Sequence, residues 1–180
     1  MCQFKSAIVV KDAKQNGGFR LLLSPWTDSH SDLIALHSLR DDGKLRFARI
    51  EYSPPDMSAA HRPETYKLKI DEGRTPEWFD GDMKEAVAKK MQAHIKTLIV
   101  TGEVALLMGG QFIIAPGAKI GAVKNALVAS VLDASIDSVY GSAHIGSVSG
   151  SARIGSVSDS ARIDSVYGSA SIVKDARAKK

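Results

Sequence analysis

The chain of 180 residues has little of several features that define common protein classes. It contains a single cysteine, Cys2, so an intramolecular disulfide is excluded. No apolar segment follows a basic start, as a secretory signal requires, and we therefore expect a cytoplasmic location. The longest apolar stretch, 98–108, is interrupted by Thr101, Gly102 and Glu103 and is shorter than the roughly 20 residues that span a bilayer. We expect no membrane partner.

The net charge of +4 is small and unevenly placed. Residues 173–180 form a basic C-terminal tail, in which Asp175 is the only acidic residue. A nucleic-acid surface normally clusters Lys and Arg over one face and often adds aromatic side chains for stacking, and the sequence shows neither pattern. We therefore expect no nucleic-acid partner and interpret the tail as a charged end that keeps an open stack in solution.

Residues 118–172 repeat a short unit: a small residue, a branched apolar residue two places later, and valine three places after that. Successive copies are nine residues apart, and eight-residue forms precede them. Such a unit is too short to bury its own apolar face, so its side chains leave water only against the next copy. The period predicts a parallel β-solenoid, a β-roll or β-helix of 8–9-residue repeats. Its nine-residue copies contain Ala134, Ala143, Ala152, Ala161 and Ala170 with Ile136, Ile145, Ile154, Ile163 and Ile172.

The spacing leaves two coil sizes open. Alanine and isoleucine two residues apart lie on one face of a strand, and the step of three to valine requires a corner. A flat two-sided coil would take two copies and a triangular coil three. The segment 136–143 recurs letter for letter at 163–170, which would stack Tyr140 on Tyr167 in a triangle, although a duplication explains the recurrence equally well. We favour the two-sided coil, and Tyr140 and Tyr167 on different faces would exclude the triangle.

Residues 1–100 show a different pattern, which predicts an α+β head domain. Turn residues at 15–18 between two apolar runs predict a hairpin, and alternation of apolar with charged residues predicts two further strands. Residues 101–117 hold turn signals around apolar segments, and we expect transition strands there that pair with the first coil. The strands predicted in the head are 2–10, 19–23, 45–52 and 65–70.

Two helices are predicted in this head domain. Ser31 would cap a short amphipathic helix that ends before Asp41, because its hydroxyl can accept a free backbone N–H. Pro76 would occupy the first position of a long second helix, where its missing N–H costs nothing. Acidic residues after Pro76, beginning with Glu77, suit the positive end of that helix dipole.

The sequence indicates no cofactor and no metal site. Calcium-binding nonapeptide rolls need an aspartate at a fixed place in every unit, whereas here the residue after isoleucine reads Asp137, Gly146, Gly155 and Asp164. The five histidines lack the spacing of zinc sites, and no phosphate-binding glycine motif is present.

Two groups of residues are candidates for catalysis. Removal of Met1 would make Cys2 the N-terminal residue and place its thiol beside an α-amine that can act as a base, as in N-terminal nucleophile hydrolases. The Met-Cys start resembles that of class II glutamine amidotransferases over these two residues only. We interpret Cys2 first as a small apolar side chain at a strand start and keep the hydrolase as an alternative. The second group, His30 with Asp28 and Asp32, is also typical of helix capping.

Five features along the chain carry a family resemblance: Met1–Ser6, Asp28–His30, Phe47–Glu51 followed by Pro54-Pro55, Pro76–Phe79, and the tail of repeats. Together they resemble an uncharacterised group of proteins found in bacteriophages and bacterial mobile elements. The similarity covers nearly the whole chain. It implies a phage or prophage accessory protein and brings no catalytic residues with it.

These observations favour a non-enzymatic accessory protein that binds a host protein or protein complex through its head and solenoid. An anti-defence inhibitor such as an anti-CRISPR protein would work in this way. One alternative is a structural protein that forms homo-oligomers through the solenoid, and another is the Cys2 hydrolase. The candidate binding residues are Ser135, His144, Arg153 and Arg162, which share one outward position of the repeat, together with Tyr140 and Tyr167.

Overall fold

The structure is a computed structural model that describes residues 4–15, 17–71 and 75–177. Within it the chain divides into two compact units, each with its own apolar core. The first unit is Met1–Pro55 with Arg62–Lys96, and the second is Asp56–His61 with Thr97–Lys180.

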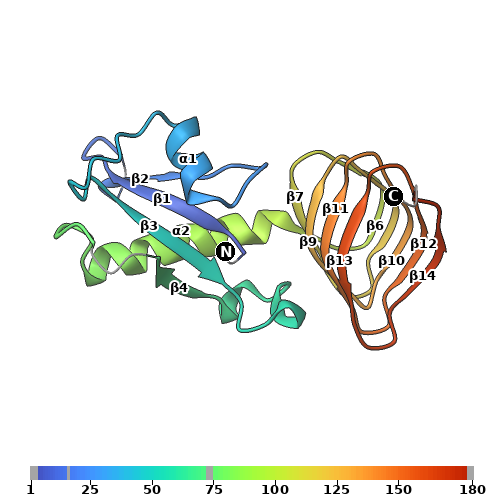
Figure 1. The fold of residues 1–180 in the computed structure, drawn as a ribbon. Helices are drawn as coiled ribbons and strands as arrows, with labels where there is room; N and C mark the ends of the chain where they lie inside the picture. The colour runs from blue at the N-terminus through green and yellow to red at the C-terminus, as the bar shows by residue number, and fades with distance from the viewer. Residues whose placement is uncertain (1–3, 16, 72–74, 178–180) are drawn as a thin grey trace. The chain divides into compact units, whose positions relative to one another are not determined.

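A four-stranded antiparallel sheet forms the centre of the first unit, with strands β1 (Ser6–Lys11), β2 (Phe19–Leu22), β3 (Phe47–Ser53) and β4 (Lys67–Ile70). Its strand order is β2-β1-β3-β4 (Figure 1). β1 and β2 form the predicted hairpin, in which Lys11 pairs with Phe19. The central strand β1 is buried over most of its length.

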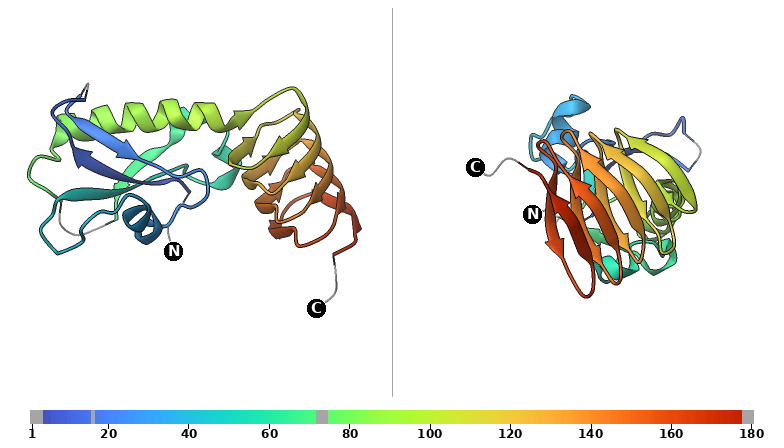
Figure 2. Two further views of the ribbon diagram at one scale, coloured as in Figure 1. Left: turned by 90° about the horizontal axis from the view of Figure 1, so that it is seen from above. Right: turned by 90° about the vertical axis from the view of Figure 1, so that its right-hand side faces the viewer.

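Two helices, α1 (His30–Leu36) and α2 (Gly81–Leu98), lie on opposite faces of this sheet (Figure 2). Leu33 of α1 packs into a cluster with Ile8 of β1. α2 turns one apolar stripe inward, as its 3.6-residue period requires. The residues that α2 buries are Val87, Met91 and Ile95.

Within the described ranges, no helix has both the length and the hydrophobicity needed to cross a lipid bilayer.

The cap of α1 is Ser29 and not the predicted Ser31. The backbone N–H of Asp32 donates to the Ser29 hydroxyl at 3.3 Å, so the helix begins at His30, two residues earlier than predicted. The Asp32 carboxylate accepts a hydrogen bond from the Thr27 hydroxyl at 2.8 Å. The segment before α1 is therefore held by capping chemistry, which is common for Ser, Thr and Asp at helix starts.

α2 begins at Gly81, and the prediction that Pro76 opens this helix was wrong. The backbone N–H of Phe79 donates to the Pro76 carbonyl at 2.9 Å, which closes a separate turn. The Asp80 carboxylate then accepts from the backbone N–H of Met83 at 2.9 Å. Proline restricts its own backbone but has no side-chain acceptor, whereas a carboxylate that receives a free N–H fixes where a helix begins.

The loop between β3 and β4 contains two short 3-10 helices, η1 (Met57–Ala59) and η2 (Pro63–Thr65). The Asp56 side chain accepts from the backbone N–H groups at the start of η1. Ala59 and Ala60 are buried, so this segment is packed although its composition is polar.

The second unit is a parallel β-solenoid of about five coils, as the repeat predicted (Figure 1). Successive strands alternate between two five-stranded sheets, called here the even sheet and the odd sheet. The even sheet contains β6 (Glu103–Met108), β8 (Lys119–Lys124), β10 (Ser135–Tyr140), β12 (Arg153–Val157) and β14 (Ser171–Asp175). The odd sheet contains β5 (Ile99–Val100), β7 (Gln111–Ile114), β9 (Leu127–Leu132), β11 (His144–Ser149) and β13 (Arg162–Val166).

Two copies of the repeat make one coil, which confirms the two-sided geometry. Ser135 pairs with Arg153, so the step between stacked strands is 18 residues. Tyr140 ends β10 in the even sheet, whereas Tyr167 directly follows β13 in the odd sheet. The two tyrosines lie on different faces, and the triangular coil is excluded.

The space between the two sheets is a continuous apolar column. Ile136, Ile145 and Ile154 are each at most 1% exposed, and the valines three places later are equally buried. Burial of one such side chain contributes about 2 kcal/mol, so the stacked copies stabilise one another. The segment 101–117 also belongs to this stack, because β6 pairs with β8 and β7 with β9.

A residue in the left-handed backbone region turns the chain at each corner of the coil. Eight-residue copies have a single corner residue, Asn125 or Asp133, between the strand and the next alanine. Nine-residue copies have two, as in Gly141-Ser142. The ninth residue is therefore an enlarged corner and leaves the strands in register.

The repeated serine at the fourth position of each strand links neighbouring coils. Its hydroxyl donates to the main-chain carbonyl at the third position of the strand one coil earlier, as for Ser165 and Gly146 at 2.9 Å. This pairing satisfies the hydroxyl and adds to the strand ladder. The other three examples are Ser138 with Gly121, Ser147 with Ala129 and Ser156 with Asp137.

Candidate binding faces of the solenoid

Four of the sequence-predicted binding residues lie on the outer surfaces of two different sheets. Ser135 and Arg153 are paired neighbours in the even sheet, and His144 and Arg162 are paired neighbours in the odd sheet. They share one position in the repeat, but a coil takes two copies and so turns alternate copies to opposite sides. The structure therefore brings these residues together as two pairs.

The two predicted tyrosines have different surroundings. The ring of Tyr140 is half-buried, and the Lys124 ammonium lies 5.6 Å from its centroid, within the range of a cation–π contact. Tyr167 is 61% exposed. Identical local sequences thus give one tyrosine that is held against its neighbours and one that projects into solvent.

The odd face carries a cluster of three polar side chains that joins two coils. His144 Nε2 lies 2.7 Å from Asp164 Oδ2, and Arg162 Nη2 lies 3.9 Å from the other oxygen of the same carboxylate. All three side chains are more than a third exposed. Exposed pairs of this kind contribute about 0–1 kcal/mol, so they orient the side chains more than they stabilise the coil.

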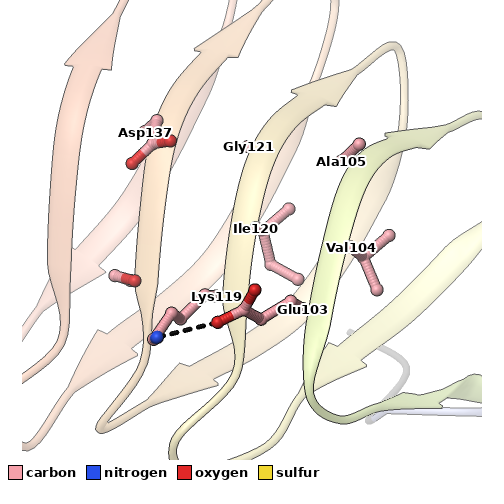
Figure 3. A pocket seen from close by; sticks show the side chains of 8 residues that line it. Glu103, Val104, Ala105, Lys119, Ile120, Gly121 and Asp137 are labelled. Atoms are coloured by element: carbon pink, nitrogen blue, oxygen red, sulfur yellow. Dashed lines mark hydrogen bonds and ion pairs between the residues drawn. The ribbon is translucent and has the colours of Figure 1, made fainter.

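The even face contains a hollow over β6, β8 and β10, with a volume of about 450 Å³. Figure 3 shows Glu103 and Lys119 together at one end of it and Asp137, Gly121 and Ala105 in a row on neighbouring strands at the other end. Lys119 Nζ lies 2.8 Å from Glu103 Oε1. Small residues leave the main chain uncovered at this point, so the hollow is a property of the sheet surface.

The glycine in this hollow is required by the close approach of two strands. A Cβ on Gly121 would stand 2.6 Å from the Ala105 carbonyl oxygen, closer than real contacts allow. The neighbouring coil therefore fixes a small residue at this position, and the hollow is preformed.

The charges at the rim are set by one exposed ion pair. Its hydrogen bond raises the pKa of Lys119 and lowers the pKa of Glu103. Both groups stay ionised at neutral pH. The Asp137 carboxylate makes no hydrogen bond or ion pair with the residues that the structure describes.

Glu103, Lys119 and Asp137 were missed from sequence. A signal existed, because the first-position residues Glu103, Lys119 and Ser135 are sixteen residues apart and lie in register. This spacing is hard to see in the sequence because β6 does not follow the repeat: Gly102 and Val104 stand where the later copies have alanine and isoleucine.

The first unit holds a buried polar cluster around Lys5. Lys5 is 0% exposed, its ammonium donates to the Ser24 carbonyl at 2.7 Å, and it lies 3.0 Å from Asp28 Oδ1. Burial lowers the pKa of Lys5, although Asp28 opposes this effect. Burial and the charge of Lys5 together lower the pKa of His94. The cluster thus holds Asp28 through a buried cation.

His30 has other partners than the two aspartates beside it in sequence. Its Nε2 lies 2.9 Å from the Ile50 carbonyl and its Nδ1 lies 2.9 Å from Asp71 Oδ2. Asp28 pairs with Lys5, and the Asp32 carboxylate accepts from the Thr27 hydroxyl before α1. The structure therefore shows these residues in fold-stabilising contacts.

The Cys2 candidate lies outside the described residues, as does Met1. Among the residues that are described, no group of three or more His, Cys, Asp or Glu side chains is placed to hold a metal ion.

The chain was compared with protein-family models, with curated proteins and with solved structures, and it matches none of them. Its function is therefore inferred from its own geometry.

Proposed function

We propose that this chain is a non-enzymatic binding protein that docks a host protein on the outer surface of the even sheet. The observation that carries the proposal is the preformed hollow over β6, β8 and β10. Ser135 lines this hollow, and Arg153 is its paired neighbour on β12. One of the residues predicted for binding thus lines the hollow, and a second lies next to it on the following strand of the even sheet.

The charges favour a basic side chain as the group that fills the hollow. Glu103 already has Lys119 as its partner, whereas the Asp137 carboxylate is exposed and makes no contact with a described cation. A Lys or Arg of the partner would place its charge beside Asp137 and its aliphatic part over Ala105 and Gly121. The partner is therefore a protein with a projecting basic residue.

Rigidity supports a binding role. The strands of the even sheet are held in register by ladder hydrogen bonds and by serines such as Ser138, whose hydroxyl donates to the Gly121 carbonyl at 3.2 Å. A surface that is already ordered loses little conformational entropy when a partner docks. The main chain at Ser135 and Arg153 is held by the same ladder.

The sequence resemblance to phage and mobile-element proteins supports a host protein complex as the partner. An accessory protein that inhibits a host defence or regulatory complex in the cytoplasm needs a specific surface and no catalytic group. The even face meets that requirement.

Capture from bacterial lysates with surface variants tests this function. Ser135→Arg would fill the hollow, and Leu127→Arg makes the same change at the same strand position on the odd sheet. We expect the wild type and Leu127→Arg to retain the same host protein, and Ser135→Arg to lose it. Asp137→Asn should weaken retention by about tenfold if a basic residue fills the hollow.

Two results would overturn the proposal. One is a wild-type chain that retains no macromolecule from any of several hosts. The other is a partner that binds Ser135→Arg as tightly as the wild type, because this would remove the hollow from the interface. Circular dichroism of each variant shows whether the solenoid is intact.

A further inference from the structure

The last coil of the solenoid leaves its apolar interior open at the C-terminal end. Val166 of β13 is 42% exposed, whereas Val148 and Val157, which occupy the same position in earlier strands, are 0% exposed. Ile163 and Ile172 are only partly buried. These side chains point into the column like their counterparts, so their exposure comes from the lack of a following coil among the described residues.

The strand edges are open at the same end. β13 and β14 are the outermost strands of their sheets, and each pairs with a described strand on one side only. The described residues after β14 follow the coil: Ala176 donates its N–H to the Val157 carbonyl, and Arg177 pairs with Asp175. On β14 Asp175 takes the place of the inward valine, so the apolar side chains open at this end are Ile163, Val166 and Ile172. Two open strand edges beside such side chains are a template for further strand pairing.

A second copy of this chain fits that end. The occupant must present two strand edges at the separation of the two sheets, with apolar side chains between them, and another terminal coil has this geometry. A two-fold axis across the end would pair identical surfaces, as most homodimers do. The stacking that buries the column within one chain would then continue from one copy into the other.

The charges on β13 are self-complementary in such a pair. If two β13 strands run antiparallel with Ile163 opposite Ile163, Arg162 of each copy lies opposite Asp164 of the other. Both side chains are exposed on the same face of the strand. Opposite charges that face each other across a strand pair stabilise it, and this register provides two such pairs.

We infer that the chain forms a two-fold dimer through its last coil, with β13 paired antiparallel to β13 of the second copy. This inference is independent of the proposed function, because the end of the column and the hollow on the even face share no residues. A dimer would carry two even faces and could bind two partners or two sites on one assembly.

Light scattering coupled to size-exclusion chromatography tests the dimer on the full chain. We expect the wild type to have twice the monomer mass and Val166→Glu to have the monomer mass. Met108→Glu is the matched control, since Met108 is also an exposed apolar residue but lies on β6, at the opposite end of the even sheet. A wild type that stays monomeric at high concentration would overturn the inference, as would a dimeric Val166→Glu.

Charge-reversal variants test the register. Arg162→Asp gives a chain with two acidic residues on β13, and Asp164→Arg gives a chain with two basic ones. We expect each variant alone to be monomeric and an equimolar mixture to form heterodimers. A mixture that remains monomeric would contradict the pairing. A host protein that is lost from Ser135→Arg while the mass stays dimeric would show that the two surfaces act separately.

Discussion

The Asp133 carboxylate accepts two hydrogen bonds from Ser151 of the next coil, from the backbone N–H at 2.7 Å and from the hydroxyl at 2.9 Å. Where two large corners stack, the equivalent N–H donates to a main-chain carbonyl, as from Ser169 to Gly150 at 3.0 Å. The corner at Asp133 is one residue shorter than the corner at Gly150-Ser151 that stacks on it, so it lacks this carbonyl. The Asp133 side-chain oxygen takes its place as the acceptor. Asn125 does the same on the other edge of the solenoid.

This relationship predicts a pH effect at Asp133. The hydrogen bonds from Ser151, first that of its backbone, lower the pKa of Asp133 below its ordinary value of 3.8. Its stabilising contribution is therefore complete above pH 3.8 and is lost as the pH falls through the lower pKa of the folded state. Asp133→Asn keeps an acceptor oxygen, so we expect near-wild-type stability at pH 7 and a smaller loss in acid. Urea unfolding at several pH values measures both, and an unchanged acid limb would contradict the assignment.

Gly150 is fixed by the same carboxylate. A Cβ on Gly150 would lie 2.2 Å from Asp133 Oδ1, and its φ of 68° is left-handed. We expect Gly150→Ala to cost about 3 kcal/mol, from backbone strain and overpacking together. Gly117→Ala is the control, because Gly117 has a φ of 79° but no atom within 4 Å of its Cβ position. It should cost only about 1 kcal/mol in the same unfolding assay.

The apolar column predicts a gradient of stability along the solenoid. Ile145 is 0% exposed, so Ile145→Ala should cost about 3 kcal/mol through lost burial and a cavity. Ile172 lies in the open last coil and is only partly buried, so Ile172→Ala should cost less than about 1.5 kcal/mol. Equal losses for the two variants would mean that the last coil is covered in solution, as it is in the dimer inferred above. A dilution series to monomer should restore the difference.

Lys5 predicts a stability change in alkaline solution. Burial lowers its pKa below the ordinary 10.5, so between these two values the unfolded chain binds the proton more strongly and stability rises with pH. Lys5→Met removes this rise and leaves Asp28 without its buried cation, which should cost about 3 kcal/mol at pH 7. The exposed Lys11→Met is the control and should keep the alkaline slope. Chemical unfolding between pH 7 and the alkaline range follows both variants.

The alternative hydrolase makes a prediction about Cys2. The proposed binding function does not use this thiol, so Cys2→Ser should retain the host partner as well as the wild type does. Intact-mass measurement shows whether Met1 is removed. A chain that keeps Met1 cannot use Cys2 as an N-terminal nucleophile. A processed chain with a hydrolytic activity that is lost in Cys2→Ser would favour the hydrolase.

The solenoid could be predicted because its signal is a repeated one. A branched residue at the same place in every copy, such as Ile136 and Ile145, has only the neighbouring copy to pack against, and this logic holds without knowledge of any distance. The start of α2 could not be predicted from Pro76, because several local acceptors competed for the free N–H groups. Asp80 caps α2 because the chain bends at Phe79 first.

The candidate site depended on relations that no single segment contains. Glu103, Lys119 and Asp137 line one hollow because strands sixteen residues apart stack in register, and Gly121 leaves space there because the Ala105 carbonyl approaches it. None of these residues is unusual within its own strand.

The sequence by itself determined that this chain would stack short parallel strands around alanine, isoleucine and valine, because hydrophobic period is a local property that each copy carries. Tertiary structure alone decided which face each polar residue occupies. Ser135 and His144 hold the same position in the repeat, yet the two-sided coil turns them to opposite sheets. That choice depends on how many copies close one turn, which is set by the packing of complete coils against one another.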